Sequence, residues 1–244
     1  MTPAAAASVQ TGGMREIREL TEMDEMTEAS VMIGRIWGGD RDVMPASVLR
    51  ALQHSGNYVV GVFDDGEMVG ASVGFFGAPA RRAMHSHITG VAPERQGQGW
   101  GRMLKNHQKE WAFARDVGHI TWTFDPLGAR NAHFNLRVLG TRAIEYLPNH
   151  YGALRGGIES GDETDRLMVT WALAAPPAPT PDDADVVASV QIPRDIEAVR
   201  AEGPGDAARW RVRVREAILG HLSEGLVIGG FDDERGYLFV RPRV

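Results

Sequence analysis

The stretch Val91-Ala-Pro-Glu-Arg-Gln-Gly-Gln-Gly-Trp-Gly-Arg102 decides the fold of this chain. A strand-like run leads into it, and an amphipathic helical pattern begins directly after its glycines at positions 97, 99 and 101. Glycines let the backbone approach a ligand closely. The first N–H groups of a helix have no partner within the helix and lie at the positive end of its dipole. The stretch therefore predicts a pyrophosphate-binding turn at a helix N-terminus, where Arg102 adds a cation.

Two other phosphate-binding motifs do not fit this stretch. A dinucleotide-binding turn needs G-x-G-x-x-G, whereas these glycines occupy every second position. A P-loop ends in Gly-Lys followed by Ser or Thr, whereas this stretch continues as Gly101-Arg-Met. A glycine-rich turn without a ligand is the remaining alternative, and the flanking strand and helix argue against it.

The rest of the chain, up to about residue 173, alternates between strand-like and helix-like patterns. Alternating apolar residues predict strands, and apolar residues three or four apart predict helices. The predicted strands cover residues 16–20, 57–63, 67–76, 84–91, 120–124, 141–147 and 167–173, and the predicted helices cover 26–37, 45–54, 100–114 and 129–139. This order predicts an α/β (α+β) fold, with a mixed, mainly antiparallel sheet and helices on its faces. In the strand at 84–91, strict alternation places His85, His87 and Thr89 on one side.

The segment from Gln96 to Gly101 resembles the signature Q/R-x-x-G-x-G/A of the GNAT N-acyltransferases, and the order of elements over residues 15–173 is similar to theirs. Residues 85–152 also resemble a bacterial GNAT subgroup that shares a C-terminal extension. The resemblance implies that acetyl-CoA or another acyl-CoA is the co-substrate. It also implies that the pantetheine arm pairs with free backbone groups of the strand before the signature, and that an N–H near Val91 stabilises the oxyanion. The expected cofactor-binding residues are Thr89, Gly90, Val91, Gln96, Gly97, Gln98, Gly99, Trp100, Gly101, Arg102 and Asn131.

Two histidines are the candidate catalytic residues, because the acceptor amine must lose a proton. The positions of His85 and His87 before Gln96 resemble a His-x-His pair in arylalkylamine N-acetyltransferases, and imidazoles titrate near neutral pH. We expect His87, which is nearer the thioester, to be the base. The alternative is that both histidines are structural residues, hydrogen-bonded within the sheet. Many GNAT enzymes use a tyrosine as general acid, but this chain has Leu136 at that position. Tyr146 and Tyr151 are the nearest alternatives, and each is favoured as a structural residue.

Residues around the expected sheet opening are candidates for substrate binding. Arg81 and Arg82 precede the histidine strand, and a guanidinium pair can bind a carboxylate; two solvated arginines are the alternative. In the strand at 120–124, Trp122 and Phe124 alternate with Thr121, Thr123 and Asp125. One of these sets packs against a helix, and the other lines the acceptor site. The candidates for contact with the substrate are Trp122, Phe124 and Asp125, although a core role is favoured for the two aromatic residues. Asn131 and Asn135 share a helix face, where they contact ligand or solvent.

Composition limits the other classes of function. The net charge of −6 argues against a nucleic-acid surface. The chain has no cysteine, which excludes thiolate chemistry and makes a cytoplasmic location the default. The chain has only two lysines, Lys105 and Lys109, and its preference for arginine indicates a trait of composition rather than of function. No apolar run is long enough for a membrane span, and no histidine spacing indicates a metal.

The sequence predicts four segments: a disordered tail at 1–13, an acyltransferase domain at 14–175, a proline-rich linker at 176–181 and a C-terminal extension at 182–244 that forms a homodimer contact or a lid. The predicted function is transfer of an acetyl or other short acyl group from a CoA thioester to the amine of a small molecule by direct attack. Three alternatives stay open: succinyl-CoA-dependent N-succinylation of an amino acid, a non-catalytic acyl-CoA-binding module, and a protein acetyltransferase.

Overall fold

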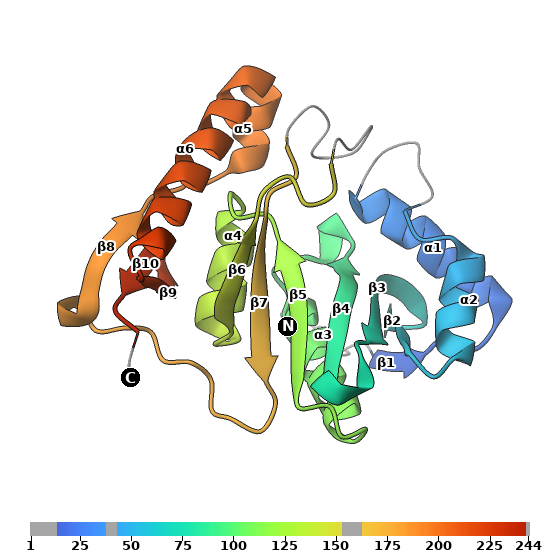
Figure 1. The fold of residues 1–244 in the computed structure, drawn as a ribbon. Coiled ribbons are helices and arrows are strands. Elements are labelled where there is room, and N and C mark those ends of the chain that lie inside the picture. The colour runs from blue at the N-terminus through green and yellow to red at the C-terminus, as the bar shows by residue number, and fades with distance from the viewer. Residues whose placement is uncertain (1–13, 38–42, 153–162, 243–244) are drawn as a thin grey trace, which may run out of the picture.

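Seven strands form the main sheet of the protein. The computed structural model describes residues 14–37, 43–152 and 163–242. The strands are β1 (Arg15–Glu19), β2 (Tyr58–Asp64), β3 (Glu67–Phe76), β4 (Ala83–Val91), β5 (His119–Phe124), β6 (Arg142–Leu147) and β7 (Arg166–Ala172). Their order across the sheet is β1-β2-β3-β4-β5-β7-β6, and every neighbouring pair is antiparallel except β4 with β5 (Figure 1). The predicted mixed, mainly antiparallel sheet is confirmed.

Helices cover both faces of this sheet. On one face, α1 (Met23–Trp37) and α2 (Ala46–His54) bury the apolar residues Met26, Ile33 and Leu49 against β2, β3 and β4. On the other face lie α3 (Trp100–Phe113) and α4 (Ala129–Ala132), the latter continued by a π-helical turn, His133–Val138. In Figure 1, α3 and α4 are seen behind the strands. The sheet is therefore buried on both sides around β4, which carries the decisive stretch at its end.

The C-terminal part of the chain forms a second, smaller sheet. Its strands β8 (Val186–Val190), β9 (Val227–Asp232) and β10 (Gly236–Val240) are ordered β8-β10-β9, and helices α5 (Ile196–Glu202) and α6 (Pro204–Ser223) pack beside them (Figure 1). The apolar residues Trp210, Val214, Ile218 and Leu222 recur every fourth position and predict a helix, and the turn residues 232–236 predict the β9–β10 hairpin, whereas no such pattern predicts β8 or α5. Helix α5 is short, and its start is fixed by Asp195, whose carboxylate accepts hydrogen bonds from the N–H groups of Glu197 and Ala198.

One hydrophobic core runs through both sheets. Buried side chains of the C-terminal segment, such as Val214, Ile218 and Phe231, belong to the same cluster as Leu136 of the π-helical turn and Tyr146 of β6. The proline-rich segment also packs: Ala178 donates a backbone hydrogen bond of 2.9 Å to Gly140 O. The expected tail at 1–13 lies outside the described residues, and the boundaries at 175 and 181 stay a prediction. Within the described ranges, no helix has the length and apolar character needed to cross a membrane.

Candidate active site

Strands β4 and β5 separate after three paired residues. Their parallel register pairs Ala83 with His119, Met84 with Ile120 and His85 with Thr121, whereas β4 continues to Val91. From Ser86 onward, β4 therefore has an edge that faces β5 without pairing with it. A free strand edge presents N–H and C=O groups that an extended ligand can pair with. Thr89, Gly90 and Val91, the expected pantetheine-binding residues, lie at the open end of this split.

The glycine turn at the end of β4 leads directly into the N-terminus of α3. Gly97 and Gly99 have φ values of +80° and +88°, which explains the need for glycine at both positions. A Cβ atom added at Gly101 would meet only Phe134 Cζ, at 3.9 Å. No side chain caps the N-terminus of this described helix, so its first N–H groups remain available for an anion. The open backbone, the positive end of the helix dipole and exposed Arg102 together fit the pyrophosphate of CoA.

Side chains of the signature have different surroundings. Gln96 connects the turn to both neighbouring elements: its Nε2 donates to Val91 O at 3.2 Å, and its Oε1 accepts from Arg130 at 2.7 Å. Trp100 is 1% exposed and covered by Arg15, whose guanidinium lies 4.3 Å from the ring centroid. Only the backbone of Trp100 is therefore available to a ligand. Gln98 and Asn131 are exposed, consistent with the prediction that they contact the cofactor.

A β-bulge lies at His87, next to the split. The β3 neighbours Val73 and Gly74 pair with Ile88 and Ser86, so His87 is an extra residue without a partner in β3. A bulge shifts the alternation of side chains along its strand. The sequence prediction of one face for His85, His87 and Thr89 is therefore wrong for Thr89, whereas the two histidines share a face.

Thr89 lies on the opposite side of the sheet from the histidines. Its hydroxyl is 3.4 Å from Ser86 Oγ on the α3 side, whereas Ile88 packs in the cluster beneath α1 and α2. The bulge thus gives β4 a polar stripe on the α3 side and leaves the two histidines on the other side.

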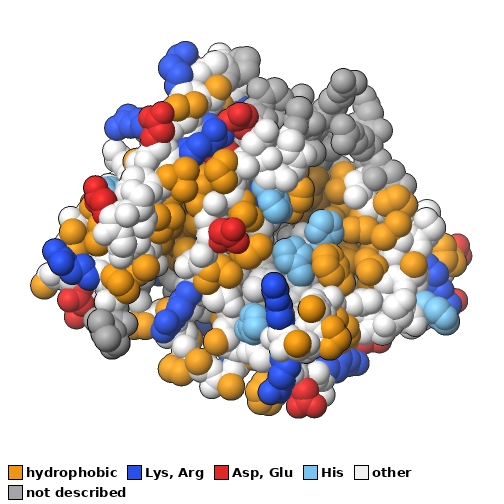
Figure 2. All heavy atoms as spheres, viewed as in Figure 1, with side chains coloured by type: hydrophobic (Ala, Val, Ile, Leu, Met, Phe, Trp, Pro, Cys, Tyr) orange, Lys and Arg blue, Asp and Glu red, His pale blue; other side chains and the backbone are white. Residues whose placement is uncertain are grey.

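The two histidines share one aromatic neighbour. The ring of Phe75 lies 5.3 Å from that of His85 and 5.9 Å from that of His87, and the two imidazoles are 6.1 Å apart. His85 Nδ1 is 3.4 Å from Thr121 Oγ1, the last paired residue of β5. Figure 2 shows several histidine side chains gathered at the centre of the face of the molecule that is turned toward the viewer, bordered by hydrophobic atoms. Both candidate bases therefore lie beside the start of the split.

Burial keeps both imidazoles neutral at physiological pH. Burial, together with the nearby His87, Lys105 and His150, lowers the pKa of His85 to about 4. Burial also lowers the pKa of His87. A neutral imidazole can accept the proton that an attacking amine loses. His87 is the more exposed of the two, which keeps it the better candidate for contact with an acceptor.

The aromatic residues of β5 are core residues rather than a floor for the acceptor. Trp122 is 6% exposed and its Nε1 donates to Asn135 Oδ1 at 3.2 Å, on the α3 side. Phe124 is 7% exposed and belongs to the main core. The prediction of substrate contact for these two residues is therefore wrong, as is the prediction that Asn135 meets ligand or solvent. Thr123, on the other face, lies with its hydroxyl 3.3 Å from Tyr151 Oη.

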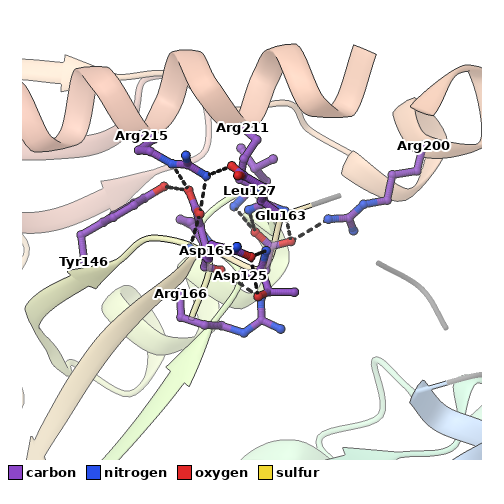
Figure 3. Close-up of polar contacts among 12 residues, drawn as sticks. Asp125, Leu127, Tyr146, Glu163, Asp165, Arg166, Arg200, Arg211 and Arg215 are labelled. Atoms are coloured by element: carbon purple, nitrogen blue, oxygen red, sulfur yellow. Dashed lines mark hydrogen bonds and ion pairs between the residues drawn. The ribbon is translucent and has the colours of Figure 1, made fainter. Parts of the chain in front are cut away.

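Asp125 is held by two arginines of the C-terminal segment, which the sequence analysis missed (Figure 3). Arg211 binds both carboxylate oxygens, and Arg200 Nη2 donates to Oδ2 at 2.8 Å. Burial alone raises the pKa of Asp125, but its hydrogen bonds and ion pair with Arg211, together with Leu127 N and Arg200, hold it below the usual value. A carboxylate occupied in this way does not serve as a base or bind an acceptor, so the prediction for Asp125 is corrected.

A second carboxylate, Asp165, is bound in the same manner before β7. Arg215 donates to both of its oxygens, at 2.8 and 2.6 Å, and Tyr146 Oη donates at 2.6 Å (Figure 3). Burial and the hydrogen bond to Asp165 raise the pKa of Tyr146. Tyr146 is therefore a structural residue, as the sequence analysis favoured, and not a general acid.

Arg81 and Arg82 lie at the closed end of the split. Arg82 Nε donates to Asp116 O at 3.0 Å, and the next residue begins the paired part of β4. At about 3.3 Å per residue, the open end at Val91 is roughly 25 Å away. Arg82 thus connects the start of β4 to the loop after α3, and carboxylate binding by Arg81 and Arg82 stays a prediction.

The sequence analysis also passed over Lys105, which is buried beneath the split. It lies on the apolar face of α3, four residues after Gly101 and next to Leu104. A lysine inside a helical apolar stripe was the available signal, because lysine is almost never fully buried without a partner.

A protein-family model described as the acetyltransferase (GNAT) family matches residues 23–140. The match extends from the beginning of α1 to the end of the π-helical turn, so it contains the histidines, the split and the glycine turn. A comparison with curated protein sequences found no match.

Solved structures with a similar fold include three acetyltransferase-related proteins. The ribosomal-protein-S18-alanine N-acetyltransferase of Escherichia coli is 16% identical, with a TM-score of 0.54 over 67% of this chain and 96% of that one. The protein yncA of Salmonella typhimurium, solved with its cofactor acetyl-CoA, is 18% identical, with a TM-score of 0.54 over 70% of this chain and 99% of that one. A spermidine N-acetyltransferase chimera from Vibrio cholerae is 14% identical, with a TM-score of 0.53 over 66% of this chain and 96% of that one. These likenesses concern the fold.

Proposed function

Because this chain belongs to the GNAT acetyltransferase superfamily, we propose that it transfers an acetyl or other short acyl group from a CoA thioester to the amine of a small molecule. The observation that carries the proposal is the split between β4 and β5, which opens toward a glycine turn at an uncapped helix N-terminus. An extended arm ending in phosphates matches this combination of a free strand edge and an anion site.

Each part of the site has one task in this proposal. The N–H groups from Gly97 to Arg102 bind the pyrophosphate, and the free edge at Thr89, Gly90 and Val91 pairs with the pantetheine arm. The thioester supplies an activated acyl carbon. An N–H on the free edge of β4 near Ser86, where the strand leaves β5, stabilises the oxyanion, a contribution of about 3–4 kcal/mol where it has been removed from other enzymes.

His87 takes the proton of the attacking amine and, as the more exposed of the two imidazoles, passes it to solvent. Both rings are neutral at pH 7, and they lie within 6.1 Å of each other beside the split. Direct attack in a ternary complex requires no nucleophilic side chain, which agrees with a chain that has no cysteine. The neutral histidines also favour turnover over the alternative of a binding module.

The proposed acceptor is the amine of a small molecule. The relatives in fold include enzymes named for a ribosomal protein and for spermidine, so the fold accommodates both classes. The net charge of −6 identifies neither a basic protein tail nor a nucleic acid as the acceptor. Amino-acid succinylation stays an alternative, because Arg81 is exposed four residues before His85, whereas Arg82 Nε donates to Asp116 O.

The test combines binding and turnover. Acetyl-CoA at 100 times its dissociation constant should raise the free energy of unfolding by about 2.7 kcal/mol, measured by thermal unfolding with desulfo-CoA and ATP as comparison ligands. Release of CoA thiol is then followed with acetyl-CoA and succinyl-CoA against arylalkylamines, spermidine, amino acids and a basic peptide. An unmoved unfolding curve with millimolar acetyl-CoA would sink the proposal, and turnover with the peptide alone would replace the small-molecule acceptor by a protein.

A further inference from the structure

Lys105 places a charged group in the core at the point where the two strands separate. Its side chain is 4% exposed, and its Nζ donates to Ser86 Oγ and to Gln108 Oε1, both at 2.9 Å. The same nitrogen lies 3.7 Å from the centroid of the Trp122 ring. Among residues 14–37, 43–152 and 163–242, no carboxylate forms an ion pair with it.

Ser86 and Trp122 mark the apex of the split. The last paired residues are His85 in β4 and Thr121 in β5, so Ser86 and Trp122 are the first residues of each strand beyond the pairing. The Lys105 ammonium contacts both from the α3 side, whereas the histidines lie on the opposite side of β4. The apex thus has a cation on one side and a neutral base on the other.

A closed ring of polar side chains holds the ammonium in place. From Ser86 Oγ the contacts pass to Thr89 Oγ1 at 3.4 Å, to Ser72 Oγ at 2.8 Å and to Gln108 Nε2 at 3.4 Å, and Gln108 returns to Lys105. Satisfied polar networks of this kind fix the position of buried groups. The ring lies directly under residues 86–89 of β4, the part of the strand that leads from the apex to the expected pantetheine edge.

The surroundings of Lys105 allow it to change charge near neutral pH. Burial lowers the pKa of Lys105 to about 7, because a buried ammonium loses its hydration. Of the described groups that face it, His85 is titratable and lies across β4; Ser72, Ser86, Thr89, Gln108 and Trp122 are neutral. The group can therefore give up a proton and recover one within the physiological range.

We propose that Lys105 supplies the proton to the CoA sulfur when the acyl group is transferred, through the hydroxyl of Ser86. This inference rests on the proposed function. As the amine nitrogen bonds to the acyl carbon and the carbon–sulfur bond breaks, Ser86 gives its proton to sulfur and takes one from the Lys105 ammonium. His87 takes the proton lost by the amine. Lys105 is left neutral and regains a proton from solvent, so the net movement is one proton from nitrogen to sulfur. This route does not need a tyrosine acid, which the chain lacks because it has leucine at position 136.

Direct titration of Lys105 is possible because the chain has only two lysines. Protein labelled with ¹³C at lysine Cε gives two side-chain signals, and Lys109→Met assigns them. Lys109 is the matched control, since it lies one turn further along α3 with its Nζ 5.2 Å from the Trp171 ring. We expect Lys105 to titrate near 7, and its midpoint to rise when CoA binds but not when desulfo-CoA binds, because only CoA brings a thiolate to the ammonium.

The thiol of bound CoA gives the second measurement. Its thiolate absorbance, with the desulfo-CoA complex as blank, should titrate about 1–3 pH units below that of free CoA, the range for an opposite charge a few ångströms away. Lys105→Met, which keeps the length of the side chain, should remove this shift, whereas Lys109→Met should preserve it.

The outcomes separate this proposal from the proposed function. If acetyl-CoA binds but the titration midpoint of Lys105 is the same with CoA as with desulfo-CoA, the role of Lys105 is overturned and acyl transfer stays in place. The appearance of acetyl-lysine at position 105 in mass spectra would also overturn it, because an acylated lysine carries no transferable proton. Failure of any CoA compound to bind is instead a failure of the proposed function.

Discussion

Gly99 and Gly101 lie two residues apart at the start of α3, but they need to be glycine for different reasons. Gly99 is the N-cap residue and has φ +88°, a conformation that other residues adopt at a cost. Gly101 lies within the helix, and space beside it is open except for Phe134. The first glycine is therefore required by the backbone, and the second by whatever occupies that space.

Substitution at these two positions separates folding from binding. Gly101→Ala should stabilise the helix by about 0.5–1 kcal/mol, and Gly101→Leu should fold but bind acetyl-CoA at least tenfold more weakly, measured by calorimetry. Gly99→Ala is the comparison variant, and it should lower the free energy of unfolding without any ligand. Unchanged acetyl-CoA affinity in Gly101→Leu would mean that the pyrophosphate binds elsewhere.

The histidine pair predicts the rising limb of the pH–rate profile. An imidazole acts as a base only when it is neutral, so the rate rises as pH increases through its pKa. Burial lowers the pKa of both His85 and His87, which moves the limb below about 6.5 rather than into the range of 6 to 8 that the sequence suggests. His87→Gln should reduce kcat about 10²-fold or more and flatten this limb, with a smaller effect in His85→Gln.

The control for this prediction is His54→Gln, a change at an exposed residue at the end of α2. It should leave both rate and profile unchanged. If the double variant of His85 and His87 kept the wild-type profile, water would replace the histidines as the proton acceptor.

At the level of elements, sequence patterns succeed where their cause is local. The glycine spacing from Gly97 to Gly101 and the apolar repeat of α3 are properties of neighbouring residues; the turn and the helix are confirmed, whereas pyrophosphate binding there stays a prediction. The bulge at His87 depends on how β4 pairs with β3, and the partners of Asp125 lie 75 and 86 residues further along the chain. No local pattern contains such information. The alternation rule therefore fails at His87, and Asp125 is misread as a residue of the acceptor site.

The two bound carboxylates predict a loss of stability in acid. The pKa of Asp125 and that of Asp165 are lower in the folded protein than in the unfolded chain, so each stabilises the fold at neutral pH. This contribution is lost as pH falls below about 4. In urea unfolding, Asp125→Asn should cost about 3–5 kcal/mol at pH 7, because it leaves Arg211 buried without its charge partner.

Asp206→Asn is the matched control for this change. Asp206 pairs with Arg209 on the exposed surface of α6, with exposed fractions of 53% and 75% for the two side chains, and such pairs contribute about 0–1 kcal/mol. An Asp125→Asn protein as stable as this control at pH 7 would show that the buried pair contributes nothing to the fold.

On the scale of the whole molecule, the C-terminal segment behaves as part of the main core. Tyr237 is fully buried and donates to Pro126 O at 2.8 Å, immediately after β5. Arg211 reaches the adjacent Asp125 from α6. These contacts join residues that the sequence analysis assigns to different domains, and they lie beside the strand that forms one side of the split.

A fragment of residues 14–175 is therefore expected not to fold on its own. Removal of the C-terminal segment exposes the apolar surface around Leu136 and Tyr146 and leaves Asp125 without its arginines. Circular dichroism and thermal unfolding of the fragment should show no cooperative transition. A cooperative fragment that binds acetyl-CoA with the affinity of the full chain would instead establish 14–175 as an independent domain.

The bulge at His87 also matters for how related sequences are compared. Because β4 has one extra residue, its alternation reverses at the bulge: odd-numbered residues face the histidine side up to position 87, and even-numbered residues face that side after it. An alignment without a gap at this point would equate Thr89 with residues that point toward the histidine side. Deletion of His87 would remove the bulge: Ser86 and Ile88 would become consecutive residues, still paired with Gly74 and Val73, and Ile88 and Thr89 would keep their present sides. The inserted residue thus adds a second histidine to one face of the strand without moving the polar ring on the other.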